Sequence, residues 1–245
     1  MLVAVHGWLL SGRLWDPLFD HWQGRWSCWC PDLPGFGGSS RPPGLQPSLA
    51  SYGRWLAAAV QQRAAGSPVV LIGHSLGGSI ALHAAALLGP QLQGLVQVAV
   101  GGGIYQPRPF VAVRRGGAAF LRWRPGWLAQ VPAAAPLANP LRADLRAARG
   151  LLACSMRRQA VQQLPLLVHQ LSVPSLWIAG SNDRVMESRY VRHLASYAPD
   201  HDLVELGGAG HLPMRQMPDR LAGAIDGWLV QRLASPRSCS SASRA

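Results

Sequence analysis

One serine stands between two glycines in the segment Gly73-His74-Ser75-Leu76-Gly77. This G-x-S-x-G pattern is typical of a sharp turn from a strand into a helix, which holds the serine in a strained conformation with its hydroxyl exposed. We expect Gly73 and Gly77 to be needed because a side chain at either position would crowd such a turn. Ser75 is therefore a candidate nucleophile, which requires a base to take its proton.

A base and an acid that orients it follow later in the chain. Asp183 comes directly after the strand-like run Leu176 to Ala179, and His211 lies in a glycine-rich loop after the run Leu203 to Leu206. In enzymes with this serine turn, the acid and then the histidine follow the serine, each in a loop after a strand. We therefore predict a catalytic triad of Ser75, Asp183 and His211, which is the chemistry of acyl transfer.

The start of the chain supplies a second part of such a site. The apolar run Leu2 to Val5 is followed at once by His6-Gly7-Trp8. An early loop of this kind gives one backbone N–H for a tetrahedral oxyanion, and the residue after the nucleophile gives the other. We expect Trp8 and Leu76 to be these donors, and His6 to brace the loop.

The elements that must position these residues alternate between strands and helices. Continuous apolar runs without polar alternation suit strands of a parallel sheet that is buried on both faces. We predict an α/β fold with a mostly parallel sheet of about six strands, covered by helices on both faces. The expected strands lie at about residues 2–5, 27–31, 69–72, 95–99, 175–179 and 202–206. Asp32 is expected to tie together the turn at residues 32–37.

Five motifs carry a family resemblance: HGW, PDLPGFGGS, GHSLGG, GSNDRV and GAGHLP, in this order over nearly the whole chain. Together they resemble the α/β-hydrolase superfamily. HGW with DLPGFG resembles the carboxylesterases that act on pimeloyl-carrier-protein methyl ester in biotin synthesis. DLPGFGGS and SLGG also resemble the SHCHC synthases of the menaquinone and phylloquinone route.

The resemblance implies a serine hydrolase that cleaves a carboxylic ester or thioester through an acyl-enzyme. The substrate would be a small molecule or an acyl ester carried by a carrier protein. One alternative is an elimination by the same triad, as in an SHCHC-synthase-like lyase. Another is a ligand-binding protein on this fold without catalysis. The segment from Gly101 to Gln170 matches neither subfamily and leaves the substrate open.

The superfamily inserts its cap between the core segments, and this chain has a suitable segment there. We expect residues 1–103 and 171–234 to form the hydrolase core and residues 104–170 to form a helical cap. Residues 235–245 are small and polar and are expected to be a disordered tail.

Charge is concentrated in this expected cap. All 23 basic residues are arginine. The segment between Gly101 and Gln170 contains ten of them and a single acid, Asp144, so it carries a net charge of +9 out of the +12 of the whole chain. Three interpretations stay open: a solvated helical face, a docking site for an acidic carrier protein, and a surface for nucleic acid or anionic membrane, which an assembled triad disfavours. The candidate docking residues are Arg114, Arg115, Arg122, Arg124, Arg142, Arg146, Arg149, Arg157 and Arg158.

Other classes of site and location find little support. The chain has no metal-ligand spacing and no glycine-rich phosphate loop, so we expect no metal and no cofactor. The first apolar run lacks the flanks of a secretory signal, and no uncharged apolar run is long enough to span a bilayer. Of the four cysteines, Cys28 and Cys30 lie two apart on an expected strand and are poorly placed to pair, Cys154 lies in a helical run and Cys239 in the tail. A cytoplasmic protein is the expectation.

Overall fold

The computed structural model describes residues 1–101, 107–124 and 138–233. Its strands are β1 (Leu2–Val5), β2 (Cys28–Trp29), β3 (Val69–His74), β4 (Leu92–Val98), β5 (Ser175–Gly180) and β6 (His201–Leu206). Its α-helices are α1 (Asp16–Trp22), α2 (Leu49–Ala64), α3 (Leu76–Leu88), α4 (Pro107–Trp123), α5 (Ala138–Arg142), α6 (Leu145–Ser155), α7 (Arg158–His169), α8 (Ser188–Ala195), α9 (Pro213–Gln216) and α10 (Pro218–Leu233). The predicted tail 235–245 and the cap residues 104–106 and 125–137 lie outside the described part.

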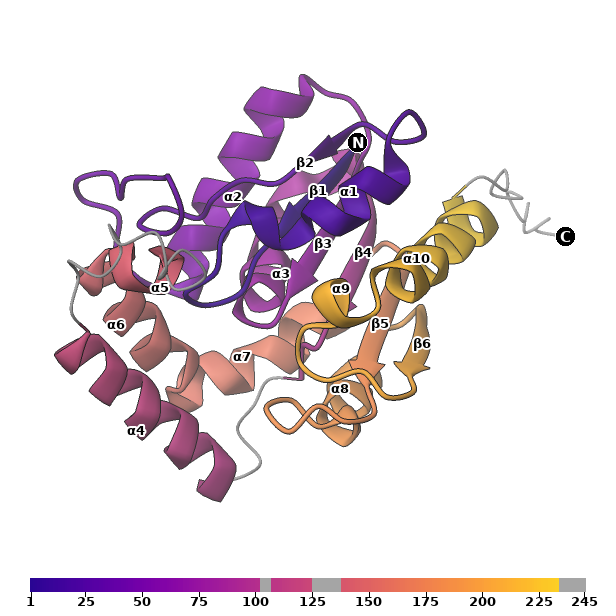
Figure 1. Ribbon diagram of the computed structural model, residues 1–245. Helices are drawn as coiled ribbons and strands as arrows, with labels where there is room; N and C mark the ends of the chain where they lie inside the picture. Colours follow the sequence, from indigo (N-terminus) through magenta and orange to yellow (C-terminus); the bar gives the residue numbers. More distant parts are fainter. Residues whose placement is uncertain (102–106, 125–137, 234–245) are drawn as a thin grey trace, which may run out of the picture.

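The strands form one sheet in the order β2-β1-β3-β4-β5-β6, and every neighbouring pair is parallel. The predicted α/β architecture with a parallel sheet is therefore confirmed. Consecutive strands are joined through helices, as parallel pairing requires. In Figure 1 the sheet stands in the middle of the molecule, with α1 and α10 on one side and α2 and α3 on the other.

Two hydrophobic cores fill the spaces between the sheet and these helices. Successive strand residues point to opposite faces, so Val3 and Val5 contribute to one core while Leu2 and Ala4 contribute to the other. The first core receives residues from α2, α3 and α8, and the second from α1, α9 and α10. Because both faces are covered, the strands can be apolar throughout, which explains the runs seen in the sequence.

Two strands differ from their predicted limits. The second expected strand, 27–31, shortens to Cys28–Trp29 because it is an edge strand that pairs only with β1, at two positions. The fourth begins at Leu92 rather than 95. Gly94 is a weak strand former, but a Cβ there would lie 2.8 Å from the Trp228 ring, so the glycine makes room for α10.

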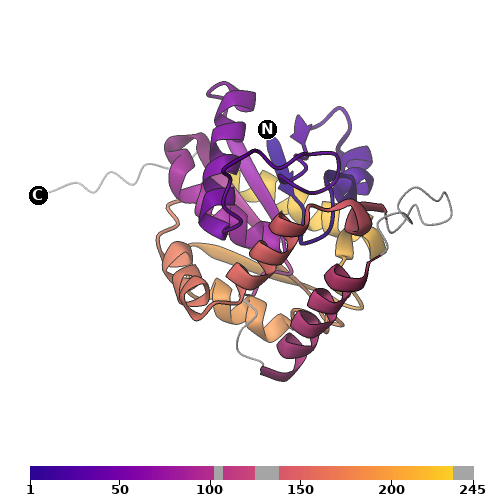
Figure 2. The same ribbon diagram turned by 90° about the vertical axis from the view of Figure 1, so that its left-hand side faces the viewer.

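Helices α4 to α7 come between β4 and β5 in the chain and lie together on one side of the core (Figures 1 and 2). Helix α7 contacts α3 and α8, and α6 contacts α2, α4 and α7. Asp144 joins this group to the core: it caps α6 by accepting from the Ala147 N–H at 2.7 Å and pairs with Arg41 at 3.2 Å. We call α4 to α7 the cap helices; the boundaries 104–170 stay a prediction.

None of the described helices is long and apolar enough to cross a membrane. Cys28, Cys30 and Cys154 are free thiols. Burial raises the pKa of Cys28 to about 11, and that of Cys30 still further, so both stay protonated at neutral pH.

Candidate active site

The turn between β3 and α3 has the strained geometry that its sequence predicts. Ser75 has φ 51° and ψ −123°, which a non-glycine residue rarely adopts. Its N–H donates to the Val98 carbonyl at 3.0 Å, so the end of β4 holds the turn in place. A Cβ at Gly73 would lie 2.4 Å from the Gly78 Cα, and one at Gly77 would lie 2.2 Å from the His6 carbonyl oxygen. Both glycines are therefore required for this close approach.

The structure brings together the three residues predicted as a triad, from three separate loops. His211 Nε2 lies 3.2 Å from Ser75 Oγ, and His211 Nδ1 lies 2.8 Å from Asp183 Oδ2. A carboxylate can only accept, so Nδ1 carries the proton and Nε2 is left free to accept from the serine hydroxyl. This is the tautomer that a general base in this position needs.

Asp183 is fixed independently of the histidine. Its side chain is fully buried, and its second oxygen, Oδ1, accepts from the N–H groups of Val185 and Met186, both at 2.8 Å. Each carboxylate oxygen therefore has its own partners, and the group is held in one orientation. The two backbone donors were not foreseen from the sequence, although the turn residues after Asp183 are of the kind that satisfies an aspartate locally.

The two proposed oxyanion donors border the same space as Ser75. Trp8 and Leu76 both line the cavity that contains the serine. Neither of their N–H groups donates to an acceptor among the described residues. Leu76 is the first residue of α3, where helix N–H groups are free and the dipole favours negative charge. The Trp8 indole donates to the Ala148 carbonyl of α6 at 2.9 Å, which links this loop to the cap helices.

His6 and Asp32 fix the loops around these donors. His6 is fully buried; its Nδ1 donates to the Gly7 carbonyl at 2.8 Å, and its Nε2 accepts from the Leu33 N–H at 2.9 Å. Burial lowers the pKa of His6 to about 4, so the ring is neutral at physiological pH. Asp32 accepts from the N–H groups of Gly12 and Gly38 at 2.6 and 2.7 Å. Both side chains have the bracing geometry expected of them.

A cavity of about 460 Å³ opens onto the serine and is mostly apolar. Core and cap helices both contribute to its wall. The cap residues were not identified from the sequence, although Leu152 and Ser155 of α6 and the following Met156 have the three- and four-residue spacing of one helix face. The lining residues are Trp8, Leu10, His74, Ser75, Leu76, Ser79, Val100, Gly101, Leu152, Ser155, Met156, Leu164, Val185, Met186, His211 and Leu212.

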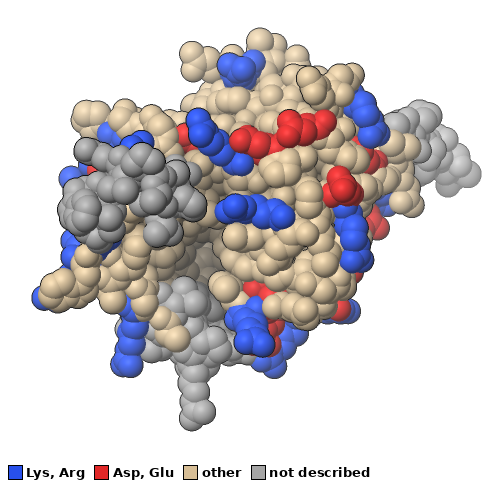
Figure 3. Space-filling model, viewed as in Figure 1, with Lys and Arg blue, Asp and Glu red and all other residues tan. Residues whose placement is uncertain are grey.

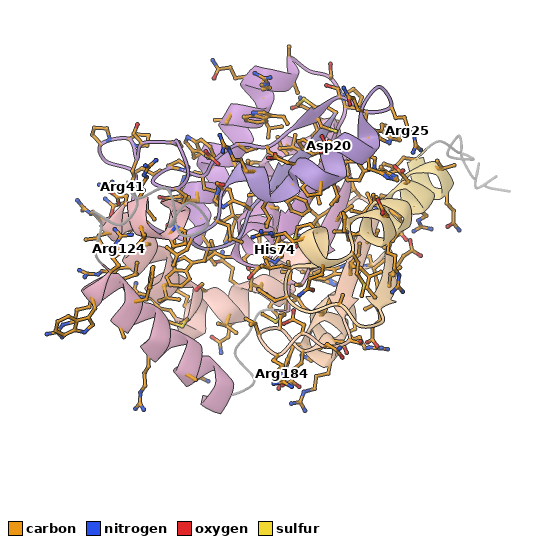
Figure 4. The ribbon with its side chains drawn as sticks, viewed as in Figure 1. Asp20, Arg25, Arg41, His74, Arg124 and Arg184 are labelled. Atoms are coloured by element: carbon orange, nitrogen blue, oxygen red, sulfur yellow. The ribbon has the colours of Figure 1, made fainter. Side chains whose placement is uncertain are left out.

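The arginines singled out from the sequence divide into different environments. Arg124 is half-buried and donates to the Pro140 and Ala143 carbonyls at 2.6 and 2.5 Å, so it joins α4 to α5 and its neighbours (Figure 4). Arg149 donates to the Leu121 carbonyl at 3.3 Å. The exposed side chains are those of Arg115, Arg122, Arg142, Arg146, Arg149, Arg157 and Arg158, while the side chain of Arg114 lies outside the described part.

In Figure 3, blue arginine atoms lie on the cap side of the molecule, at left, where few red acidic atoms are seen; over the core, blue and red atoms lie side by side. Asp144, the acid of the expected cap, is paired with Arg41. The charge imbalance read from the sequence is thus present on the described surface of the cap helices.

Among the described residues there is no group of three or more His, Cys, Asp or Glu side chains placed to hold a metal ion.

Comparisons with known proteins agree with this geometry. A family model described as "Alpha/beta hydrolase family" matches residues 2–224. The chain is 34% identical to the pimeloyl-[acyl-carrier protein] methyl ester esterase of Xanthomonas axonopodis pv. citri, over 91% of this chain and 92% of the relative. Among solved structures, it is similar to a thermophilic esterase from Thermogutta terrifontis (24% identity, TM-score 0.73, 94% and 89% of the two chains). It is also similar to MenH from S. aureus (18% identity, TM-score 0.75, 94% and 93%). At these identities the two structures show a shared fold.

Proposed function

The chain belongs to the alpha/beta hydrolase family, and we propose that it hydrolyses a carboxylic ester through an acyl-enzyme formed on Ser75. The observation that carries the proposal is the continuous chain of contacts from Ser75 through His211 to the buried Asp183. Esterases among the relatives and structural neighbours support the same class of reaction.

In the proposed mechanism, Ser75 Oγ attacks the ester carbonyl carbon while His211 Nε2 takes the hydroxyl proton. The carbonyl oxygen becomes an oxyanion, which the N–H groups of Trp8 and Leu76 stabilise. Collapse of this intermediate breaks the bond to the alkoxy group, and His211 returns the proton to the departing alcohol. A water molecule then attacks the acyl-serine in the same way, releasing the acid and restoring Ser75. Asp183 stabilises the imidazolium in both steps.

The proposed substrate is an acyl ester attached to an acyl carrier protein. The relative from Xanthomonas axonopodis pv. citri carries the name of a pimeloyl-[acyl-carrier protein] methyl ester esterase, and the match covers 91% of this chain. The apolar cavity suits the methylene chain of such a substrate.

The elimination alternative is less well supported by the cavity. Its substrate carries several carboxylates, which arginines would hold in pairs of hydrogen bonds. No arginine lines the cavity within the described residues. We therefore favour ester hydrolysis.

The exposed cap arginines are the proposed docking surface for the carrier protein, whose negative charge they complement. A second hollow of about 420 Å³ lies beside α4 and α6 and is lined by Arg149 and Arg157. It shares Leu152 and Met156 with the cavity at Ser75. A basic surface and the catalytic cavity therefore meet at the same two side chains, which supports approach of the carrier from the cap side.

Two substrates of different size test both parts of the proposal. We expect hydrolysis of a carrier-linked methyl ester and of a small neutral ester such as p-nitrophenyl butyrate. Only the kcat/KM for the carrier-linked ester should depend on the salt concentration. Raising the salt concentration from about 50 to about 500 mM shortens the Debye length from about 14 to about 4 Å, which weakens steering by exposed charges. The kcat/KM for the carrier-linked ester should therefore fall strongly.

Charge reversal at the hollow separates docking from a solvated face. Arg157→Glu and Arg149→Glu should lower kcat/KM for the carrier-linked ester at low salt and leave the small ester unchanged. Arg63→Glu, the same charge change at the end of α2, is the matched control. Equal salt dependence for the two substrates, or equal effects of all three variants, would contradict docking at the cap. Turnover of the SHCHC precursor without ester hydrolysis would replace the proposed reaction with elimination, and turnover of neither substrate would favour a binding protein.

A further inference from the structure

A second histidine, His74, is buried beside the proposed triad and has no part in the mechanism above. It is the last residue of β3, directly before Ser75, and only 1% of its surface is exposed. Figure 4 shows it near the centre of the molecule. Its ring centroid lies 4.9 Å from that of His211, with the ring planes tilted by 55°.

His74 contacts the backbone of the proposed base rather than its ring nitrogens. His74 Nε2 lies 2.8 Å from the His211 carbonyl oxygen, across 137 residues of sequence. A carbonyl only accepts hydrogen bonds, so Nε2 must carry the proton. The Nδ1 atom is then an acceptor, and it has no hydrogen-bond partner among the described residues.

The other side of the ring lies against the oxyanion loop. A Cβ at Gly7 would come within 2.8 Å of His74 Nδ1, so only glycine leaves room for the imidazole there. Burial, followed by the neighbouring His211, lowers the pKa of His74 to about 3. The ring is therefore neutral at physiological pH, and its single N–H is committed to the His211 carbonyl.

The loop that carries His211 needs such an anchor. It contains Gly207, Gly208 and Gly210, residues with wide backbone freedom. The Gly208 N–H donates to Ser181 Oγ at 2.8 Å, and the Gly210 N–H donates to Gln216 Oε1 at 2.7 Å. These bonds fix the loop before the histidine, and the bond from His74 fixes the histidine residue itself.

We infer that His74 is a positioning residue, which holds the backbone of His211 so that its imidazole stays aligned with Ser75. The inference rests on the proposed function, because it assigns a task only if His211 is the general base. It goes beyond the triad because one neutral ring contacts three segments: the turn that carries Ser75, the loop His6-Gly7-Trp8 and the loop that carries His211.

Three variants test this role. His74→Leu removes the donor, whereas His74→Gln places an amide N–H near the position of Nε2. His83→Leu is the matched control, because His83 is also buried, on α3, but does not line the cavity. Misplacing a catalytic group by about 1 Å can cost about 100-fold in rate. We expect kcat for p-nitrophenyl butyrate to fall between about 10-fold and 100-fold in His74→Leu with KM within about twofold, and to recover substantially in His74→Gln.

Proton NMR reports on the effect of the bond from His74 to the His211 carbonyl without substrate. The Nδ1 proton of His211, bonded to Asp183, should give a low-field proton resonance in the wild type, His74→Gln and His83→Leu. It should broaden or disappear in His74→Leu. An unchanged resonance and unchanged kcat in folded His74→Leu would overturn the inference, as would equal losses in His83→Leu. If His74→Leu does not fold, failure of His74→Gln to retain both the resonance and kcat overturns it. If the wild type shows the resonance but hydrolyses no ester, the proposed function fails, and the resonance in the three variants still tests whether His74 positions His211.

Discussion

Replacing Asp183 with asparagine should abolish most of the esterase activity for a reason that the structure specifies. The carboxylate has two sets of partners: Oδ1 accepts two backbone N–H groups, and Oδ2 accepts from His211 Nδ1. An asparagine has one oxygen, so it can satisfy one set only. Turning its NH₂ group toward the N–H groups of Val185 and Met186 would leave these two part-buried donors without their acceptor, at up to about 1–3 kcal/mol each.

The amide oxygen is therefore expected to keep the two backbone bonds, and its NH₂ group then faces His211. This arrangement favours the imidazole tautomer with the proton on Nε2, which cannot take the proton of Ser75. For a triad with the wrong tautomer, kcat falls by about 10⁴-fold, equivalent to about 5.5 kcal/mol in activation free energy. The range of about 2–6 kcal/mol from the two backbone bonds brackets this value.

The assay is kcat for p-nitrophenyl butyrate at neutral pH, with the unfolding midpoint as a check on the fold. Asp202→Asn is the control, because Asp202 accepts from the Trp228 indole at 2.9 Å and does not line the cavity. It should keep kcat within about twofold, since removing a contact away from the site leaves the chemistry intact. Folded Asp183→Asn with kcat within about tenfold of the wild type would refute the reasoning and point to another acid.

Three further predictions concern the scaffold. Gly77→Ala should prevent folding or activity, because the new Cβ would lie 2.2 Å from the His6 carbonyl oxygen. In the control Gly223→Ala, on α10, the new Cβ has no atom within 4 Å, so activity should be unchanged and the free energy of unfolding should rise by about 0.5–1 kcal/mol. Trp8→Phe removes the indole bond to α6 and should lower the free energy of unfolding by about 1 kcal/mol in urea titration, with a fall in kcat; an unchanged kcat would mean that the bond does not position the oxyanion loop. Acid should destabilise the fold, because burial lowers the pKa of His6 to about 4 and that of His74 to about 3, below the value of about 6.5 in the unfolded chain, so that the unfolded state binds more protons. The contribution to the free energy of unfolding is complete above about pH 6.5 and declines by about 1.4 kcal/mol per pH unit for each group toward pH 4. An unchanged slope of the free energy of unfolding against pH in His74→Gln would contradict this assignment.

Much of the sheet and of the triad arrangement could be predicted because both depend on local patterns. Apolar runs, interrupted in β6 only by Glu205, predicted the positions of β1, β3, β5 and β6 within about two residues, and loops after strands marked Asp183 and His211. The limits of β2 and β4 depended on neighbours distant in the sequence, such as Trp228 against Gly94.

Contacts between residues distant in the sequence, including those of the cap helices with the site, could not be predicted in the same way. The bond from Trp8 to Ala148 joins residues 140 positions apart, and the tie from His74 to the His211 carbonyl spans 137. No local pattern encodes such contacts, because each depends on how separate elements pack. The arginine count was likewise visible in the sequence, but the use of Arg124 to bind two cap carbonyls was not.

Labelling by a fluorophosphonate probe tests the central claim most directly, because only a serine with a working base and oxyanion donors reacts rapidly and irreversibly. Intact-protein and peptide mass spectrometry should find one adduct per chain, on Ser75, with esterase activity lost in step with labelling. Ser75→Ala and His211→Ala should show neither labelling nor esterase activity. Full esterase activity in labelled protein or in Ser75→Ala, or an adduct on another residue, would contradict the account.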